Sequence, residues 1–146
     1  MRVQGVILAL ASRPQKREEM SLSDSLNLSP EEGVSEDYGS NKRRQISFLD
    51  ESSWDAACFD IDAKLPWQAR RANVFVRGLN LLELKGKSVH IGLVEVEILG
   101  EVVPCHQMEL AHIGLENALR TGGRGGVYGR ILNSGVIRIG DEIRTA

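Results

Sequence analysis

Short apolar runs, most of them ended by a glycine or a proline, dominate this chain of 146 residues. Runs of this kind are typical of β-strands, because helices need longer stretches with apolar residues every three or four positions. Strands are expected at residues 3–10, 45–49, 73–76, 88–91, 93–99, 126–132 and 136–139, with a last one after Gly140-Asp141. The sequence Asn133-Ser134-Gly135 between two of these runs predicts a hairpin. The pattern therefore favours a β-rich α+β domain.

Two segments show helical spacing instead. The first has apolar residues at positions i, i+3, i+4 and i+7, which are Trp54, Ala57, Cys58 and Ile61. Residues 50–53 (DESS) supply N-cap chemistry, and Ser52 stands three residues before Asp55, the spacing of a capping box. The second runs from Met108 to Leu119 and ends at Gly122-Gly123. With about seven or eight strands and two or three peripheral helices, a closed β-barrel is the economical way to remove sheet edges.

The stretch from about residue 12 to residue 44 breaks this pattern. It contains the serine-rich SLSDSLNLS, the acidic EEGVSEDYGS and the basic NKRR, with few apolar anchors. A long loop is expected here, with one short strand at about 22–28, and it is predicted to be the most mobile part of the molecule. A chain of this length otherwise predicts a single domain over residues 1–146.

Composition excludes several classes of protein. The chain has 18 Lys and Arg against 20 Asp and Glu, and only 5% aromatic residues, which argues against nucleic-acid binding. Its opening, MRVQGVILALASRP, is interpreted as a first strand rather than a signal peptide, and no run has membrane length. The two cysteines form no CxxC pair, which favours a reducing compartment. We therefore expect a cytoplasmic protein without nucleic-acid or membrane partners.

Cys105 is the residue most suited to chemistry. It follows Pro104 and begins the predicted second helix, where free backbone N–H groups and the helix dipole stabilise a thiolate. The neighbouring His106 can add positive charge. Packing as a small apolar residue is the alternative, which the sequence leaves open. Cys58, on the apolar face of the first helix, is expected in the core.

A glycine-rich segment, TGGRGGVYGR at 121–130, is the second candidate. Glycine backbone and the arginines suit an anion, although glycine at strand ends more often simply turns the chain, and the segment matches no nucleotide-binding motif. The pairs Arg43-Arg44 and Arg70-Arg71 could join an anion site or be solvated at the surface. Cys105, His106 and His112 lack zinc spacing.

Several stretches together resemble the MOSC domain, which is named for its place at the C-terminus of molybdenum cofactor sulfurase. They are GVSEDYG, RRQISFLDESSWDAAC, LPWQARRANVFVRGLNL, VHIGLVEVEILGEVVPCHQMEL, RGGVYGR and GVIRIGDEI. They follow one another in family order and cover about three quarters of the chain, with the closest likeness to small stand-alone bacterial members. The segment EDYGSNKRR departs from the family because it lacks a histidine. The resemblance implies a closed β-barrel that handles sulfur or molybdenum cofactor.

The resemblance also implies roles for individual residues. Cys105 is expected to hold sulfur as a persulfide or to bind molybdenum as a thiolate. The cofactor-binding positions map onto Arg71 and Asn73 in RRAN and onto Arg124, Gly125 and Gly126 in RGG. We expect Arg71, Asn73 and Arg124 to share one cavity with Cys105, because an anionic pterin phosphate needs several donors.

The favoured function is that of a sulfur carrier or molybdenum-cofactor-binding domain. One alternative is a molybdenum-dependent reductase of N-hydroxylated compounds with Cys105 as a permanent ligand, so whether the chain is itself an enzyme stays open. Another is a non-catalytic module that binds an anion or a partner. A cysteine desulfurase is the expected sulfur donor, and a molybdenum enzyme or cofactor the acceptor. Pyridoxal phosphate would belong to the desulfurase, because no lysine of this chain has a Schiff-base context.

Overall fold

The computed structural model describes residues 2–16, 18–40 and 43–145. Its strands are β1 (Arg2–Ser12), β2 (Ser21–Ser23), β3 (Ser25–Ser29), β4 (Gly33–Val34), β5 (Ile46–Asp50), β6 (Val74–Arg77), β7 (Ser88–Ile91), β8 (Val94–Glu101), β9 (Val127–Ile131), β10 (Gly135–Arg138) and β11 (Glu142–Thr145). Its helices are α1 (Glu51–Asp60), α2 (His106–Ala111) and α3 (Leu115–Arg120), with single turns of 3₁₀ helix at η1 (Trp67–Arg70), η2 (Leu81–Leu84) and η3 (Thr121–Gly123).

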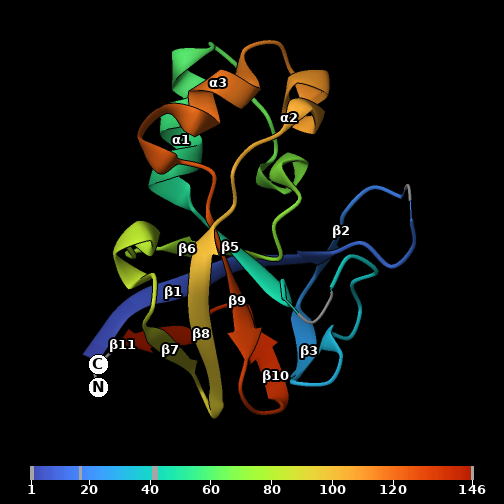
Figure 1. Ribbon diagram of the computed structural model, residues 1–146, viewed down its shortest axis with the longest axis vertical. Coiled ribbons are helices and arrows are strands. Elements are labelled where there is room, and N and C mark those ends of the chain that lie inside the picture. Colours follow the sequence, from blue (N-terminus) through green and yellow to red (C-terminus); the bar gives the residue numbers. More distant parts are fainter. Residues whose placement is uncertain (1, 17, 41–42, 146) are drawn as a thin grey trace.

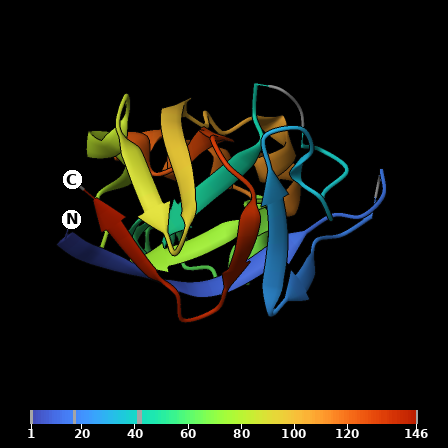
Figure 2. The ribbon, with the colours of Figure 1, turned by 90° about the horizontal axis from the view of Figure 1, so that it is seen from below.

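Within the described residues, seven strands close into a barrel (Figures 1 and 2). Neighbours follow in the order β11-β7-β8-β9-β5-β6-β1, and β1 pairs again with β11 to complete the ring. The β5–β6 pair is parallel and the other pairs of the ring are antiparallel. β2 adds one strand to β1 outside the ring. The closed β-barrel predicted from the short strands is therefore confirmed.

Two apolar clusters hold the molecule together. The first fills the barrel, as the pattern of β8 shows: Val94, Val96 and Ile98 are buried, while Glu95 and Glu97 alternate with them on the wetter face. The second lies between the barrel wall and the helices, which gather at one end of the barrel in Figure 1. Its buried members include Trp54, Ala57, Cys58, Phe75, Met108, Leu115 and Leu119.

The segment predicted as a long loop contains three short strands. β3 pairs with β10 along Ser25–Leu28 and with β4 at Leu28 and Ser29, and Leu26 and Leu28 are buried in the core. The alternation in SLNLS buries one face of this small sheet. Because its partner β10 lies more than a hundred residues further along the chain, local sequence patterns do not indicate the pairing.

The hairpin predicted at Asn133-Ser134-Gly135 is wrong, because β10 pairs with β3 and not with β9. Asn133 instead contacts the turn between β7 and β8. Its amide nitrogen donates to the carbonyl of Leu93, and its amide oxygen accepts from the backbone N–H of Glu95 at 2.7 Å. The asparagine that suggested a tight turn thus ties two separate connections together.

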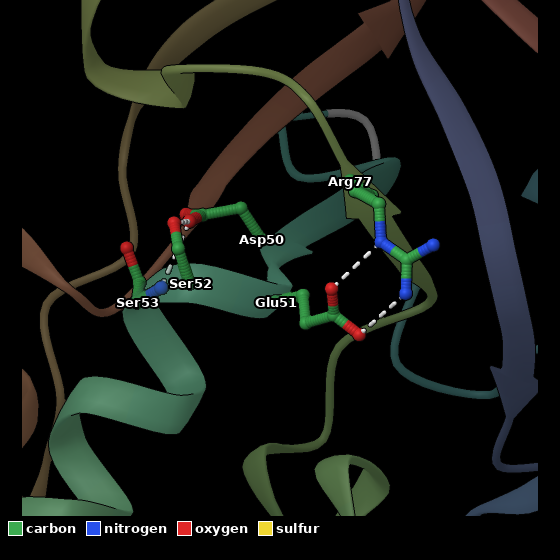
Figure 3. Close-up of polar contacts among 5 residues, drawn as sticks. All are labelled: Asp50, Glu51, Ser52, Ser53 and Arg77. Carbon is green, nitrogen blue, oxygen red and sulfur yellow. Dashed lines mark hydrogen bonds and ion pairs between the residues drawn. The ribbon is translucent and has the colours of Figure 1, made fainter.

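The N-cap of the first helix is Asp50, two residues before the Ser52 of the predicted capping box (Figure 3). Asp50 accepts from the N–H of Ser53 at 2.9 Å, while Ser52 donates its hydroxyl to Asp50 rather than pairing with Asp55. Glu51 in the first turn accepts from Arg77 at the end of β6, with 2.8 Å between Nε and Oε1. This ion pair joins the start of α1 to the neighbouring barrel strand.

The predicted second helix is two short helices. The chain breaks between α2 and α3 at Gly114, whose φ of 85° lies in the left-handed region. Glu109 stabilises the break by accepting from the backbone N–H groups of Gly114 and Glu116. No helix in the described part of the chain is both long enough and apolar enough to cross a membrane.

Candidate functional site

Cys105 lies at the surface, at the end of the connection between the barrel strand β8 and helix α2. β8 ends at Glu101, Pro104 is buried, and Cys105 is the exposed N-cap of α2. Its carbonyl accepts from the N–H of Met108 at 2.9 Å. The predicted place at a helix start is confirmed, but α2 has only six residues, so its dipole contributes less than a long helix would.

A cavity of about 200 Å³ opens at this thiol, and we call it the thiol cavity. Its walls come from β5, from η1 and the chain after it, from the end of β8 and from α2. They are Ser47, Phe48, Arg70, Arg71, Ala72, Val102, Cys105, Gln107, Met108 and Gly125. Segments far apart in the sequence therefore meet beside Cys105.

Arg70 is the buried charged residue of this wall, with 7% of its surface exposed. Its Nε donates to the carbonyl of Gly125 at 3.1 Å and its Nη2 donates to the carbonyl of Val102 at 3.0 Å. Among the described residues, no carboxylate forms an ion pair with it. Burial lowers the pKa of Arg70 most, the nearby Cys105 opposes this shift, and Arg44 adds to it. Arg70 thus holds the chain at Val102 and at Gly125 together and contributes a positive charge to the wall of the thiol cavity.

Arg71 continues the same wall in an unusual backbone conformation. Its φ of 69° is left-handed, which costs a residue other than glycine about 1 kcal/mol and is frequent at functional sites. Burial lowers the pKa of Arg71 most, Arg13 lowers it further, and Cys105 opposes both. The guanidinium group of Arg71 therefore lies close enough to both Arg13 and Cys105 to be affected by their charges.

A second hollow of about 200 Å³ lies on the other side of Arg71, and we call it the arginine cavity. Its lining is Arg13, Met20, Asp37, Gly39, Ser40, Arg44, Ile46, Ser47, Arg71, Asn73, Val102 and Tyr128. Three arginines face one carboxylate here, and Arg44 lies over the Tyr128 ring with 4.9 Å from its guanidinium carbon to the ring centroid. Ser47, Arg71 and Val102 line both cavities, so the cationic hollow adjoins the thiol.

Asn73 lies in the arginine cavity with its side-chain amide fully engaged. Its Oδ1 accepts from the N–H of Ser47 at 3.0 Å and from the Ser47 hydroxyl at 3.2 Å. Its Nδ2 donates to the carbonyl of Ala11 at 3.2 Å and to Asp37 at 2.7 Å. An amide has two donors and two acceptor positions, so these four contacts use its capacity. Asn73 therefore holds Ser47, Ala11 and Asp37 together at the wall of the arginine cavity.

Of the three residues expected to share a cavity with Cys105, only Arg71 lines the thiol cavity, and Asn73 lines the arginine cavity beside it. Arg124 lines neither. It donates to the carboxylate of Asp60 and to the carbonyl of Ala118, and it lines a separate hollow of about 370 Å³ beside the start of α1. The difference arises because η3 turns the chain between α3 and β9, which directs Arg124 toward α1.

The two glycines after Arg124 are required by close backbone packing. A Cβ at Gly125 would collide with the carbonyl oxygen of Val102, and one at Gly126 with that of Phe48. Gly126 also has a φ of 92°. Gly125 lines the thiol cavity and Gly126 the hollow beside Arg124.

Cys58 differs from Cys105 as the sequence predicts. It is buried in the cluster beneath the helices, and burial raises the pKa of its thiol. Throughout the ranges that the structure describes, no group of three or more His, Cys, Asp or Glu side chains is arranged to hold a metal ion.

Sequence reasoning missed Arg13 and the two-cavity arrangement. Arg71 was expected at the site from the family resemblance, Arg70 stood out only as its basic neighbour, and Arg13 carried no signal at all. The partners of Arg70 lie 32 and 55 residues away along the chain. Positive φ at Arg71 is equally invisible without the fold.

The fold and site define a small closed barrel that presents an exposed thiol among arginines. The chain belongs to the MOSC domain family, whose model matches residues 35–144. This family is linked to molybdenum cofactor binding or sulfur transfer. No curated protein matches the chain.

Solved structures of the same fold come from bacteria. YuaD from Bacillus subtilis has a TM-score of 0.77 at 19% identity, with 97% of this chain and 96% of that chain covered. YiiM from Geobacillus stearothermophilus has a TM-score of 0.71 at 14% identity, covering 99% of this chain and 74% of that chain. YiiM from Escherichia coli has a TM-score of 0.72 at 14% identity, covering 100% and 70%. At these identities the likeness concerns the fold.

Proposed function

We propose that this domain binds molybdenum cofactor and that Cys105 meets the cofactor, either as a molybdenum ligand or as the carrier of a sulfur atom. The observation that carries the proposal is the place of Arg71, which lines both the thiol cavity and the arginine cavity. One ligand with an anionic end and a thiol-reactive end would occupy both. Molybdenum cofactor has these two ends, a phosphate on its pterin and a metal that accepts sulfur ligands.

The donor set fits this group. Guanidinium groups hold phosphate by paired hydrogen bonds, and a thiolate is a soft metal ligand. Arg13, Arg44 and Arg71 line one cavity, and after burial the positive charge of Arg13 contributes most to lowering the pKa of Arg71. Like charges gathered in this way repel one another. A bound dianion would relieve this repulsion, so Arg13, Arg44 and Arg71 are the residues that would hold the phosphate. When bound, the cofactor supplies a metal that exchanges oxygen and sulfur ligands.

In the carrier role Cys105 performs a redox-neutral sulfur transfer. Its thiolate attacks the outer sulfur of a donor persulfide, the donor S–S bond breaks, and the donor leaves as a thiolate. Cys105 then carries a persulfide, and the proton remains on the transferred sulfur. Exposure of Cys105 and the positive charges of Arg70 and Arg71 favour this attack.

The remaining residues that the family pattern indicates have supporting roles in this proposal. Asn73 holds Asp37 and Ser47 in the arginine cavity, and Gly125 lets Arg70 and Val102 approach the thiol cavity. Arg124 and Gly126 line the separate hollow beside the start of α1. The proposal places the domain in the reducing cytoplasm, with a cysteine desulfurase as sulfur donor and a molybdenum enzyme or its cofactor as acceptor.

Cofactor loading tests the proposal. We would purify the chain from a host that makes molybdenum cofactor and measure molybdenum, pterin and sulfane sulfur per chain. Arg71→Asn should lose most of the pterin, while Arg138→Ala, which removes an exposed arginine outside both cavities, should keep it. Absence of pterin from the wild-type protein, or equal pterin in both variants, would contradict the proposal.

The Cys105→Ser variant separates the two roles of the thiol. If Cys105 is a molybdenum ligand, the Cys105→Ser protein should contain less molybdenum than the wild type, and the wild type should contain little sulfane sulfur. If Cys105 is a sulfur carrier, the Cys105→Ser protein should contain less sulfane sulfur but as much pterin as the wild type. The first outcome would also agree with a molybdenum-dependent reductase, which turnover assays with N-hydroxylated compounds would then test.

A further inference from the structure

A third hollow meets the two cavities at Arg71, and it differs from both in chemistry. This groove, of about 480 Å³, runs between η1, α2 and the segment 18–20. It is lined by Glu18, Glu19, Met20, Pro66, Gln68, Ala69, Arg71, Gln107, Met108, Leu110 and Ala111. Its volume lies within the range of roughly 300–1,000 Å³ that is typical of small-molecule sites.

The groove is continuous with the proposed site. It shares Arg71, Gln107 and Met108 with the thiol cavity, and Met20 and Arg71 with the arginine cavity. A molecule in the groove would therefore lie beside Cys105 without entering the cationic hollow.

About half of the groove surface is apolar. Met20 and Met108 provide two flexible thioethers, which adapt to ligands of varied shape, and Leu110 is 69% exposed on its rim. Ala69 and Ala111 leave open space because their side chains are small. An apolar body of a few carbon atoms would cover this surface.

The charged groups of the groove favour a cation. Glu18 and Glu19 stand on the wall formed by the segment 18–20, and within the described ranges neither forms an ion pair. The opposing charge among the lining residues is Arg71, so two carboxylates face one guanidinium group and the groove carries a net negative charge whether or not the neighbouring cavities are occupied.

We propose that this groove is a binding site for small organic cations, each with an apolar body and an ammonium-type group, held next to Cys105. Glu18 and Glu19 receive the charge, and Met20, Met108 and Leu110 contact the apolar body. Its use as a substrate subsite rests on the proposed function of Cys105, whereas the binding itself does not.

Three probes that share a phenyl body test the charge preference: phenethylamine, phenethyl alcohol and 3-phenylpropionate. Each is titrated into the full chain, and backbone amide shifts are followed by NMR. We expect phenethylamine to bind tightest, with shifts at η1, α2 and residues 18–20. Equal affinities, tightest binding of the propionate, or shifts elsewhere would overturn the proposal.

Charge removal tests the two glutamates. The double change Glu18→Gln and Glu19→Gln should weaken phenethylamine about two- to fivefold, the range for exposed ion pairs, and leave the alcohol unaffected. The matched control, Glu31→Gln with Glu32→Gln, removes an exposed acidic pair outside the groove and should change nothing. An equal loss in both double variants would refute a local role for Glu18 and Glu19.

The Cys105→Ser variant shows whether the groove proposal or the proposed function of Cys105 is wrong. The binding assay needs neither molybdenum nor sulfur, so Cys105→Ser should retain phenethylamine binding. Retained binding in a protein that never loads pterin would overturn only the proposed function. Cofactor loading without a preference for the cation would overturn only the groove proposal.

Discussion

At the scale of single residues, Arg70 connects stability with function. It is buried without a carboxylate partner in the described ranges, and its two hydrogen bonds hold the carbonyls of Val102 and Gly125. We expect Arg70→Met to lower the free energy of unfolding by about 1–3 kcal/mol, because two buried carbonyls lose their donor. Urea denaturation measures this change.

Arg71→Asn is the matched comparison. Asn tolerates the left-handed φ of Arg71, and the side chain is exposed, so stability should change by no more than about 0.5 kcal/mol. Equal losses of stability in the Arg70 and Arg71 variants would show that the hydrogen bonds from Arg70 to Val102 and Gly125 contribute no particular stability.

The two cysteines should differ sharply in reactivity. Cys105 is exposed beside two arginines, whereas Cys58 is buried. Since burial raises the pKa of Cys58, its thiolate forms only at a more alkaline pH than that of an ordinary thiol. Iodoacetamide followed by peptide mass spectrometry should therefore label Cys105 first near neutral pH, and Cys58 only as the pH rises. Equal, slow labelling of both would contradict a reactive role for Cys105.

At the scale of elements, the start of α1 depends on Asp50. Its carboxylate accepts from both Ser53 and Ser52 (Figure 3). Asp50→Ala should destabilise the protein by about 0.5–2 kcal/mol, the usual cost of losing an N-cap. Ser52→Ala should cost less, because the backbone cap stays in place. Thermal unfolding of the two variants decides between Asp50 and Ser52 as the cap, and a larger loss in Ser52→Ala would favour the capping box.

Element prediction from this sequence succeeded where the pattern is local. The alternation of Val94, Val96 and Ile98 identifies β8, and Pro104 with the following residues locates the start of α2. It failed at Gly114, because one glycine within helical spacing is compatible with a continuous helix. The position becomes a break only because Glu109 folds back to accept from the N–H of Gly114.

At the scale of the whole molecule, the segment 12–44 combines ordered and loosely held parts. It remains predicted as the most mobile region, but Leu26, Leu28 and Val34 join the main core. We expect hydrogen exchange to be slow at those β3 amides that pair with β10 and fast at residues 13–16 and 18–20. Equal protection of β3 and of residues 13–16 and 18–20, or faster exchange in β3, would contradict this division.

Barrel closure could be predicted because many short strands in a small domain leave no other economical way to remove edges. Much of the candidate site could not. Arg13, Arg44 and Arg70 reach the site from segments that no local pattern relates, and the identity of a cavity depends on how β5, η1 and α2 meet. Cys105 was predictable because its signal, a cysteine between Pro104 and a helix, is contained in neighbouring residues.

The central claim is that Cys105 and Arg71 belong to one cofactor site. The most direct measurement is the pterin content of the Arg71→Asn protein relative to wild type, both purified from a host that makes molybdenum cofactor. We expect the wild type to carry pterin, Arg71→Asn to lose most of it while remaining folded, and Arg138→Ala to retain it. Undiminished pterin in a folded Arg71→Asn protein would show that Arg71 does not belong to a cofactor site with Cys105.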